Sequence, residues 1–142
     1  DIVYDNHRKP HFAKSNFHLS ISHSHEMIAI SIHQNEITGI DIQLISDKII
    51  RIKDKFLSTQ ELSNIGQDSV SLTYCWSLKE ALFKIYGKKG AYLKENFQVT
   101  AIQFDTLKGM ASGKINCDNH KSAHQLALHR IGNYVLVYVL NS

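Results

Sequence analysis

The sequence predicts an α+β fold in which antiparallel sheets pack on helices. Strand-like segments occupy residues 17–43, helical segments occupy residues 46–86, and four further strand-like segments lie within residues 97–140. Strands that are grouped before and after the helices are typical of antiparallel α+β architectures. With 142 residues, 43% of them apolar and 20% charged, the chain has the composition of a globular protein of one domain or slightly more.

The first strands are recognised by alternation. Apolar and polar residues alternate over residues 17–22 and again over residues 28–32, and a period of two indicates half-buried strands. The polar residues 33–36 supply a turn into a third strand that ends near Gln43. We therefore expect an antiparallel meander of these strands, preceded by an irregular lead-in over residues 1–16.

Helices are expected in the middle of the chain. Ser46 is suited to cap the first helix, and Ser58 with Glu61 has the spacing of a capping box for the second. A long helix from about Val70 to Tyr86 carries an apolar stripe, and Gly87 is suited to end it. Strands then follow at residues 97–104, 110–115, 125–129 and 134–140, with turns expected at 108–109 and 132–133.

Charge and cysteine content narrow the functional class. A formal net charge of +3 is too small to indicate a nucleic-acid binder, but it suits an anionic partner. Membrane-length apolar runs and a secretory pattern are absent from the sequence, so we expect a cytoplasmic protein with no membrane or nucleic-acid partner. The two cysteines lack the spacing of a metal or redox motif.

A carboxylate interrupts the third strand. Asp41 and Gln43 lie two residues apart and therefore leave the same face of the strand. A carboxylate in this apolar setting needs water, a hydrogen-bond donor or a cation. It is open at this point whether Asp41 bonds backbone amides near a turn or ligates a metal.

The long helix carries Lys79, Glu80 and Lys84 among large apolar residues. Glu80 and Lys84 are one turn apart, which permits an intrahelical ion pair. Alternatively, Asp41 and Glu80 share one Mg²⁺, a hard cation that takes few protein oxygens and completes its shell with water and phosphate. The two lysines would then offset negative charge on a phosphate group held by this metal.

Histidines and a lysine near the N-terminus are further candidates. The separations among His18, His23, His25 and His33 do not match a helical pair of zinc ligands, and no cysteine lies among them. His23, flanked by Ser22 and a second serine, better fits a phosphate contact at a strand end. Lys9, next to Pro10, can add a point charge on a stiff backbone, or it is an ordinary solvated lysine.

Together these segments resemble the 4′-phosphopantetheinyl transferases of the surfactin-synthetase-activating type. The resemblance covers nearly the whole chain in order and rests on four short motifs. These are Arg8-Lys9-Pro10, Ile21-Ser22-His23-Ser24, Gly39-Ile40-Asp41-Ile42 and Trp76-Ser77-Leu78-Lys79-Glu80 with Lys84, which match the family's Gly-Lys-Pro, Ser-His-Ser, Gly-Ile-Asp and Trp-Ser-x-Lys-Glu-x-x-x-Lys elements.

The resemblance implies a transfer of 4′-phosphopantetheine from coenzyme A to a serine of an acidic acyl or peptidyl carrier protein, with release of adenosine 3′,5′-bisphosphate. Such holo-acyl-carrier-protein synthases serve fatty-acid, polyketide or nonribosomal peptide synthesis. By resemblance, Asp41 and Glu80 ligate magnesium, Gln43 adds an oxygen directly or through water, and Glu80 also takes the proton of the carrier serine. Lys84 would contact the diphosphate with Lys79 beside it, while Lys9, Ser22 and His23 would hold the adenosine phosphate end of coenzyme A.

The resemblance also implies the phosphopantetheinyl transferase fold with two similar lobes, the first incomplete: residues 1–44 would be the remaining part of the first lobe and residues 45–142 the second. The chain departs from the family at Gln43, where many members have glutamate, and at His25, where glycine is frequent. Because of Gln43 and the absent front end, the alternative is a diverged, non-catalytic module that binds coenzyme A or a carrier protein.

The helix that begins near Ser46 is the expected docking surface for the carrier. Ile49, Ile50 and Ile52 cannot all be buried under one helical face, so we expect at least one of them to be exposed. The basic residues beside them, Arg51, Lys53 and Lys55, suit an acidic partner.

Overall fold

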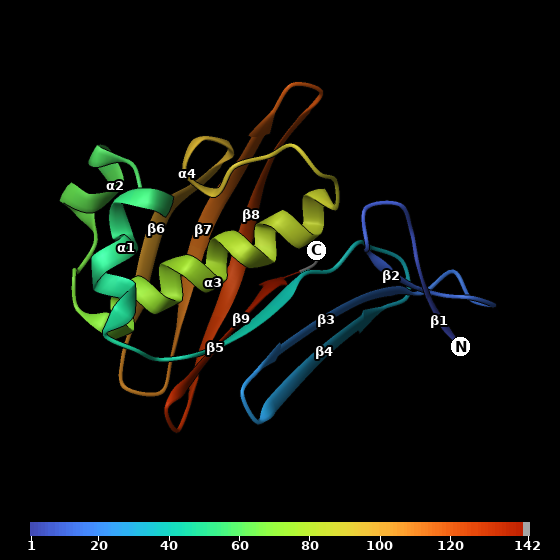
Figure 1. The fold of residues 1–142 in the computed structure, drawn as a ribbon, viewed down its shortest axis with the longest axis horizontal. Coiled ribbons are helices and arrows are strands. Elements are labelled where there is room, and N and C mark those ends of the chain that lie inside the picture. The colour runs from blue at the N-terminus through green and yellow to red at the C-terminus, as the bar shows by residue number, and fades with distance from the viewer. Residues whose placement is uncertain (141–142) are drawn as a thin grey trace.

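The computed structural model describes residues 1–140 and confirms the α+β arrangement. Strands come first in the chain, helices follow, and strands end it. Figure 1 shows α3 lying across β7 and β8, with α1 and α2 at one side of the molecule. The strands are β1 Ile2–Tyr4, β2 Pro10–Phe12, β3 His18–Ser24, β4 Met27–His33, β5 Ile40–Leu44, β6 Phe97–Phe104, β7 Lys108–Cys117, β8 His120–Ile131 and β9 Tyr134–Leu140. The helices are α1 Lys48–Phe56, α2 Thr59–Asn64, α3 Ser69–Tyr86 and α4 Leu93–Asn96.

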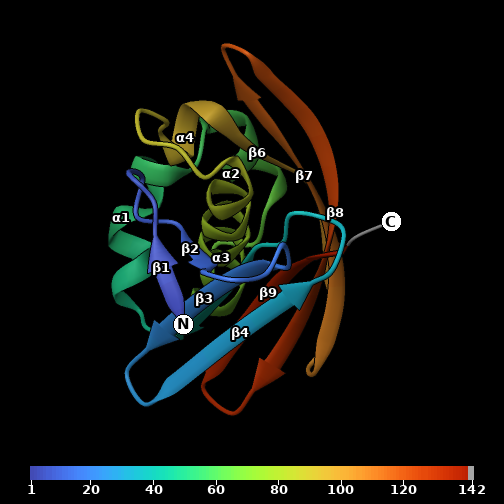
Figure 2. The ribbon, with the colours of Figure 1, turned by 90° about the vertical axis from the view of Figure 1, so that its right-hand side faces the viewer.

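The main sheet is five-stranded and antiparallel, in the order β5-β9-β8-β7-β6. Figure 2 shows this sheet curving around one side of the molecule, with the helices covering its inner face. The core lies between α3 and the sheet, because the apolar stripe of α3 meets the inward-facing residues of β7, β8 and β9. Buried α3 residues include Leu72, Leu78 and Leu82, as the helical periodicity predicted.

Both ends of α3 follow from the local sequence. The Asp68 side chain accepts a hydrogen bond from the backbone N–H of Ser71 at 2.9 Å and so caps the helix start. At the other end, Gly87 adopts φ +71°, a left-handed conformation that glycine reaches without strain. The predicted capping box of α2 is confirmed as well, since Ser58 and Glu61 bond each other's backbone N–H groups.

The predicted meander at the start of the chain is wrong. β3 and β4 form a two-stranded hairpin, whereas β5 pairs with β9 of the main sheet. Alternation shows that a segment is a strand, but it does not identify the pairing partner. The burial of β4 is also the reverse of what its isoleucines suggested, because Ile28, Ile30 and Ile32 are 71%, 55% and 54% exposed while Ala29 is buried.

Two smaller expectations also need correction. The N-terminal lead-in is not irregular throughout, because β1 and β2 form a short hairpin. The turn expected at residues 108–109 lies earlier: the Asp105 carboxylate accepts hydrogen bonds from Leu107 and Lys108 N–H, and β7 begins at Lys108. The turn at Gly132 is confirmed, with φ +58° at the glycine.

The division of the chain at residue 44 stays a prediction. In the structure, β5 shares a sheet with β9, so residues 40–44 are bonded to the part of the chain that the division assigned to the second lobe. Within residues 1–140, no helix has both the length and the apolar content needed to cross a membrane.

Candidate active site

Gly39 brings the start of β5 against the middle of α3. A Cβ at this position would lie 2.3 Å from the carbonyl oxygen of Ala81, far inside contact distance, so only glycine permits this approach of strand and helix. Because Asp41 follows two residues later, its side chain meets the turn of α3 that carries Glu80 and Lys84.

Asp41 is 2% exposed and uses only one of its carboxylate oxygens for hydrogen bonds of normal geometry. Oδ1 accepts from the Ser22 hydroxyl at 3.1 Å and from Lys84 Nζ at 3.2 Å. The same ammonium donates to the Ile40 carbonyl at 2.7 Å. Lys84 is therefore paired with Asp41 on the neighbouring strand, rather than with Glu80 in the intrahelical alternative.

The other oxygen, Asp41 Oδ2, is buried without a hydrogen-bond partner among the described residues. Burial raises the pKa of Asp41, and Lys84 offsets this in part; Ser77 and Gln43 act in the same direction as Lys84 but make no hydrogen bond of normal geometry to Oδ2. Such an atom is costly unless a donor or a cation reaches it.

Glu80 lies close enough to Asp41 for the two carboxylates to repel each other. Burial, with Asp41 as the second cause, raises the pKa of Glu80 from 4.5 to about 7, and Lys84 opposes the shift. A carboxyl group whose pKa is raised by burial and by a neighbouring carboxylate attracts either a proton or a cation.

This pKa gives a prediction for the metal-free protein. Because the folded state holds the Glu80 proton more tightly than the unfolded state, the free energy of unfolding should fall as pH rises from about 4.5 to 7. Glu80→Gln removes this loss and should stabilise the metal-free protein at pH 8 by about 1–3 kcal/mol. Urea unfolding of both proteins at pH 5 and pH 8 measures this difference in the free energy of unfolding. If the variant is no more stabilised relative to wild type at pH 8 than at pH 5, the raised pKa of Glu80 is contradicted.

Glu80 and Lys84 open onto a cavity of about 240 Å³ between α3 and the β2–β3 region. Lys9 lies at its edge, where its Nζ donates to the carbonyl of Lys84 at 3.1 Å, and burial lowers the pKa of its ammonium. A Cβ on Gly87 would come within 3.1 Å of this Nζ, so the glycine that ends α3 also makes room for Lys9. The cavity is lined by His7, Arg8, Lys9, Pro10, Leu19, Ser20, Ile21, Glu80, Phe83, Lys84 and Gly87.

The structure therefore brings together Asp41, Glu80 and Lys84, with Lys9 beside them, and places the other predicted residues differently. Ser22 is 5% exposed and contacts Asp41. His23 is exposed on the opposite face of β3 and does not line the cavity. The departure at His25 is accommodated in the β3–β4 turn, where this residue has φ +52°.

Lys79 lies apart from this cluster. Its side chain is fully buried and donates to Glu61 Oε1 at 2.8 Å and to the Leu93 carbonyl at 3.0 Å. Glu61 Oε2 also accepts from the backbone N–H of Val99 at 2.7 Å. The sequence pattern did not identify this buried ion pair, although the capping box already pointed to Glu61.

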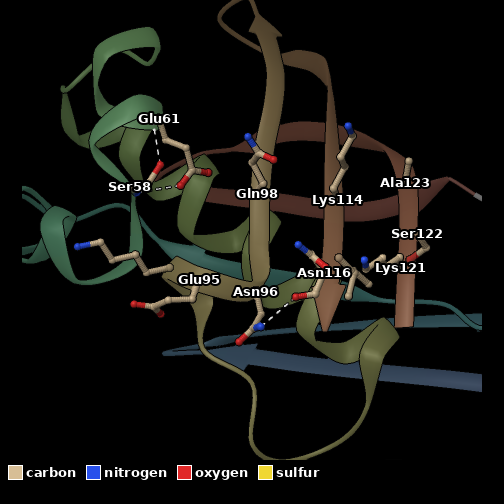
Figure 3. Close-up of a pocket in the computed structure, with 12 residues that line it drawn as sticks. Ser58, Glu61, Glu95, Asn96, Gln98, Lys114, Asn116, Lys121, Ser122 and Ala123 are labelled. Carbon is tan, nitrogen blue, oxygen red and sulfur yellow. Dashed lines mark hydrogen bonds between the residues drawn. The ribbon is translucent and has the colours of Figure 1, made fainter. Parts of the chain in front are cut away.

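A second hollow lies between α4 and the strands β6, β7 and β8 (Figure 3). Figure 3 shows Glu61 and Ser58 at one side of it and Lys114, Asn116 and Lys121 at the other. Its rim includes an amide pair in which Asn96 donates to the Asn116 carbonyl at 2.9 Å. Neither Asp41 nor Glu80 lines this hollow, and the carboxylate of Glu61 is already occupied.

Two residues that line the cavity were not predicted to belong to the site. Ser20 lies on the same face of β3 as Ser22, and the alternation of serines along this strand is the signal that could have identified it. Arg8 has φ +63° and lies at the cavity edge, but nothing in the pattern distinguishes it from a surface arginine.

Comparison with known proteins identifies the family of this chain. A model of the 4′-phosphopantetheinyl transferase superfamily matches residues 37–139, which include β5, all of α3 and all but the last residue of the main sheet. The chain is also 34% identical over 90 residues to the 4′-phosphopantetheinyl transferase gsp of Aneurinibacillus migulanus. That alignment covers 60% of this chain but only 37% of the relative. The chain belongs to the 4′-phosphopantetheinyl transferase superfamily, as the sequence motifs predicted.

Proposed function

We propose that this chain transfers 4′-phosphopantetheine from coenzyme A to a serine of an apo acyl or peptidyl carrier protein, with magnesium as the metal. The observation that carries the proposal is the meeting of Asp41 and Glu80, from a strand and a helix, beside the ammonium groups of Lys84 and Lys9. Paired carboxylates next to paired cations suit a metal-bound diphosphate. Membership of the superfamily supports the same class of reaction.

The residues present fit a hard divalent cation. Asp41 Oδ2 is a buried carboxylate oxygen without a hydrogen-bond partner in residues 1–140. Burial, and after it the charge of Asp41, raises the pKa of Glu80, and a bound cation would offset both effects. Residues 1–140 contain no group of three or more histidine, cysteine, aspartate and glutamate side chains that could hold a metal. Asp41 and Glu80, with the amide of Gln43, would therefore leave much of the shell to water and phosphate, as is usual for Mg²⁺.

In the proposed reaction, the carrier serine Oγ attacks the phosphorus that bears the pantetheine group. A new O–P bond forms, the P–O bond to the nucleotide breaks, and adenosine 3′,5′-bisphosphate leaves. Glu80 takes the serine proton as general base. Lys84 and Lys9 hold the phosphates, and bound magnesium would neutralise charge that develops on the diphosphate.

Conversion of a carrier protein tests the proposal. The chain, an apo carrier, coenzyme A and Mg²⁺ are mixed, and mass spectrometry follows the appearance of the heavier holo carrier. Conversion that stops when the metal is chelated supports the enzyme. The alternative is a non-catalytic module that binds coenzyme A or a carrier protein; the chain aligns with 37% of the length of the relative. Binding of coenzyme A or carrier without conversion would favour it.

The carrier is expected to dock at α1. Ile50 is 37% exposed, which confirms that at least one isoleucine of this helix is at the surface, and Arg51 and Lys55 are exposed beside it. Replacing Arg51 and Lys55 together with glutamate should raise the Michaelis constant for the carrier several-fold, because like charges oppose association with an acidic partner. Lys53 is left in place because its ammonium bonds the side chain of Gln67.

The control reverses the same amount of charge elsewhere. Lys114 and Lys121 are exposed on β7 and β8, so their double replacement by glutamate matches the change in net charge without touching α1. Steady-state rates at low and high salt should separate the two variants, since salt screens the attraction of the wild type for the carrier. Equal Michaelis constants for the two double variants at low salt would place the docking surface elsewhere.

A further inference from the structure

Ser22 belongs to a row of hydroxyls that joins β3 to β5. The side chains of Ser20, Ser22 and Ser24 accept hydrogen bonds from the backbone N–H groups of Ile40, Ile42 and Leu44, at 3.1, 3.0 and 3.0 Å. These N–H groups lie on the edge of β5 that faces away from β9, so the hydroxyls take the place of a neighbouring strand. Each of the three serines thus accepts one hydrogen bond from the backbone of β5.

Among these three serines, Ser22 alone bonds a carboxylate. Its hydroxyl donates to Asp41 Oδ1 at 3.1 Å, while Ser20 and Ser24 have no such contact. A serine hydroxyl has one hydrogen to donate, and here that hydrogen is directed to Asp41. Ser22 is also 5% exposed, which leaves little of it for a ligand to touch. Direct contact with a phosphate of coenzyme A, as the family motif suggested, would require this bond to break.

The two donors on Asp41 converge on one oxygen. Ser22 approaches Oδ1 from β3 and Lys84 approaches it from α3, and the lysine is itself held by the Ile40 carbonyl. Oδ2 is left as the free oxygen. A carboxylate held by both donors cannot exchange its two oxygens by rotation without losing both bonds, so Oδ2 remains the oxygen without a donor.

We propose that Ser22 is a positioning residue, which fixes the Asp41 carboxylate through Oδ1 and leaves Oδ2 as the oxygen that would bind a magnesium ion. This role rests on the proposed function, because it requires Asp41 to be a metal ligand. Hydrogen bonds that orient a ligating side chain commonly change metal affinity 10- to 100-fold. Loss of the Ser22 hydroxyl should therefore weaken metal binding without removing any atom that touches the metal.

Calorimetric titration of Mg²⁺ into the full chain with saturating coenzyme A tests this directly. Ser22→Ala should weaken Mg²⁺ binding about tenfold, and Ser22→Thr, which keeps the hydroxyl, should return the affinity to within about threefold of wild type. Ser24→Ala is the matched control, since it also removes an acceptor for a β5 N–H group but leaves Asp41 untouched. Its affinity for Mg²⁺ should equal that of the wild type.

The outcomes separate this inference from the proposed function. If the wild type binds Mg²⁺ and Ser22→Ala binds it equally well, the positioning role is wrong and the metal site stands. If Ser22→Ala instead weakens coenzyme A binding in the absence of metal and leaves Mg²⁺ affinity unchanged, Ser22 contacts the cofactor as the motif suggested. If Ser24→Ala loses as much Mg²⁺ affinity as Ser22→Ala, the loss comes from weaker bonding between β3 and β5 and not from the orientation of Asp41. If the wild type binds no Mg²⁺, the proposed function fails and the inference fails with it.

Discussion

Glu80→Gln should lower the rate of phosphopantetheine transfer about 10²–10⁴-fold, which is the contribution of a positioned base. Glutamine keeps the size of the side chain and its place on α3, but it cannot take the proton of the carrier serine and is a weaker ligand for magnesium. The fold should survive, because Glu80 is only partly buried and no described hydrogen bond of the core depends on its carboxylate. The rate is read from the mass of the carrier protein under single-turnover conditions.

Glu95→Gln serves as the control for this variant. Glu95 is an exposed glutamate of α4 and lies outside the cavity that Glu80 borders, so the substitution is chemically identical but remote from the site. It should leave transfer unchanged. A Glu80→Gln protein that retains more than about a tenth of the wild-type rate would rule out the base role.

The part of the site that could be predicted lies on regular elements with distinctive residues. The sequence predicted that Asp41 and Glu80 share one metal ion. The signals were a glycine before an isoleucine-rich strand, and two lysines and a glutamate on an otherwise apolar helix. The structure adds the cause of their proximity, which is the contact between Gly39 and the backbone of α3 at Ala81. Local patterns identify such residues because the signal is contained within one strand or one turn of helix.

The contacts that could not be predicted join residues far apart in the chain. Lys84 pairs with Asp41, 43 residues away, although Glu80 offered a partner one turn away on the same helix. β5 likewise pairs through one edge with β9 at the far end of the sequence, and its other edge is bonded by serine hydroxyls of β3. Alternation and spacing contain no information about which distant segment completes a strand, so the predicted meander failed at this step.

Lys79 belongs to a motif that the sequence identified, but its contacts in the structure differ from the phosphate contact that the motif implied. The sequence placed this lysine beside the diphosphate because it precedes Glu80, yet adjacent residues on a helix point in different directions. In the structure its ammonium is fully buried against Glu61 and the Leu93 carbonyl, and burial lowers its pKa while Glu61 opposes that shift. The pair links α3 to α2 and to α4, the short helix before β6.

Lys79→Met should therefore destabilise the protein by about 3–5 kcal/mol, the usual cost of removing one partner from a buried ion pair. Methionine fills a similar volume, but the Glu61 carboxylate would stay buried with only its bonds to the Ser58 and Val99 N–H groups. This loss is a large part of the ~5–15 kcal/mol that stabilises a typical domain. Urea unfolding measures it, with the exposed Lys114→Met as a control that should change stability by less than about 0.5 kcal/mol.

Binding of coenzyme A to the Lys79→Met protein decides between the two roles of the lysine. If Lys79 acts on the core alone, the molecules that remain folded should bind coenzyme A with wild-type affinity, because Lys84 and Lys9 still border the cavity. Calorimetry at low temperature, where the folded fraction is known from circular dichroism, provides the measurement. A variant with wild-type stability and weakened coenzyme A binding would instead support the phosphate contact that the motif suggested, and it would mean that the Glu61–Lys79 bond opens when the cofactor binds.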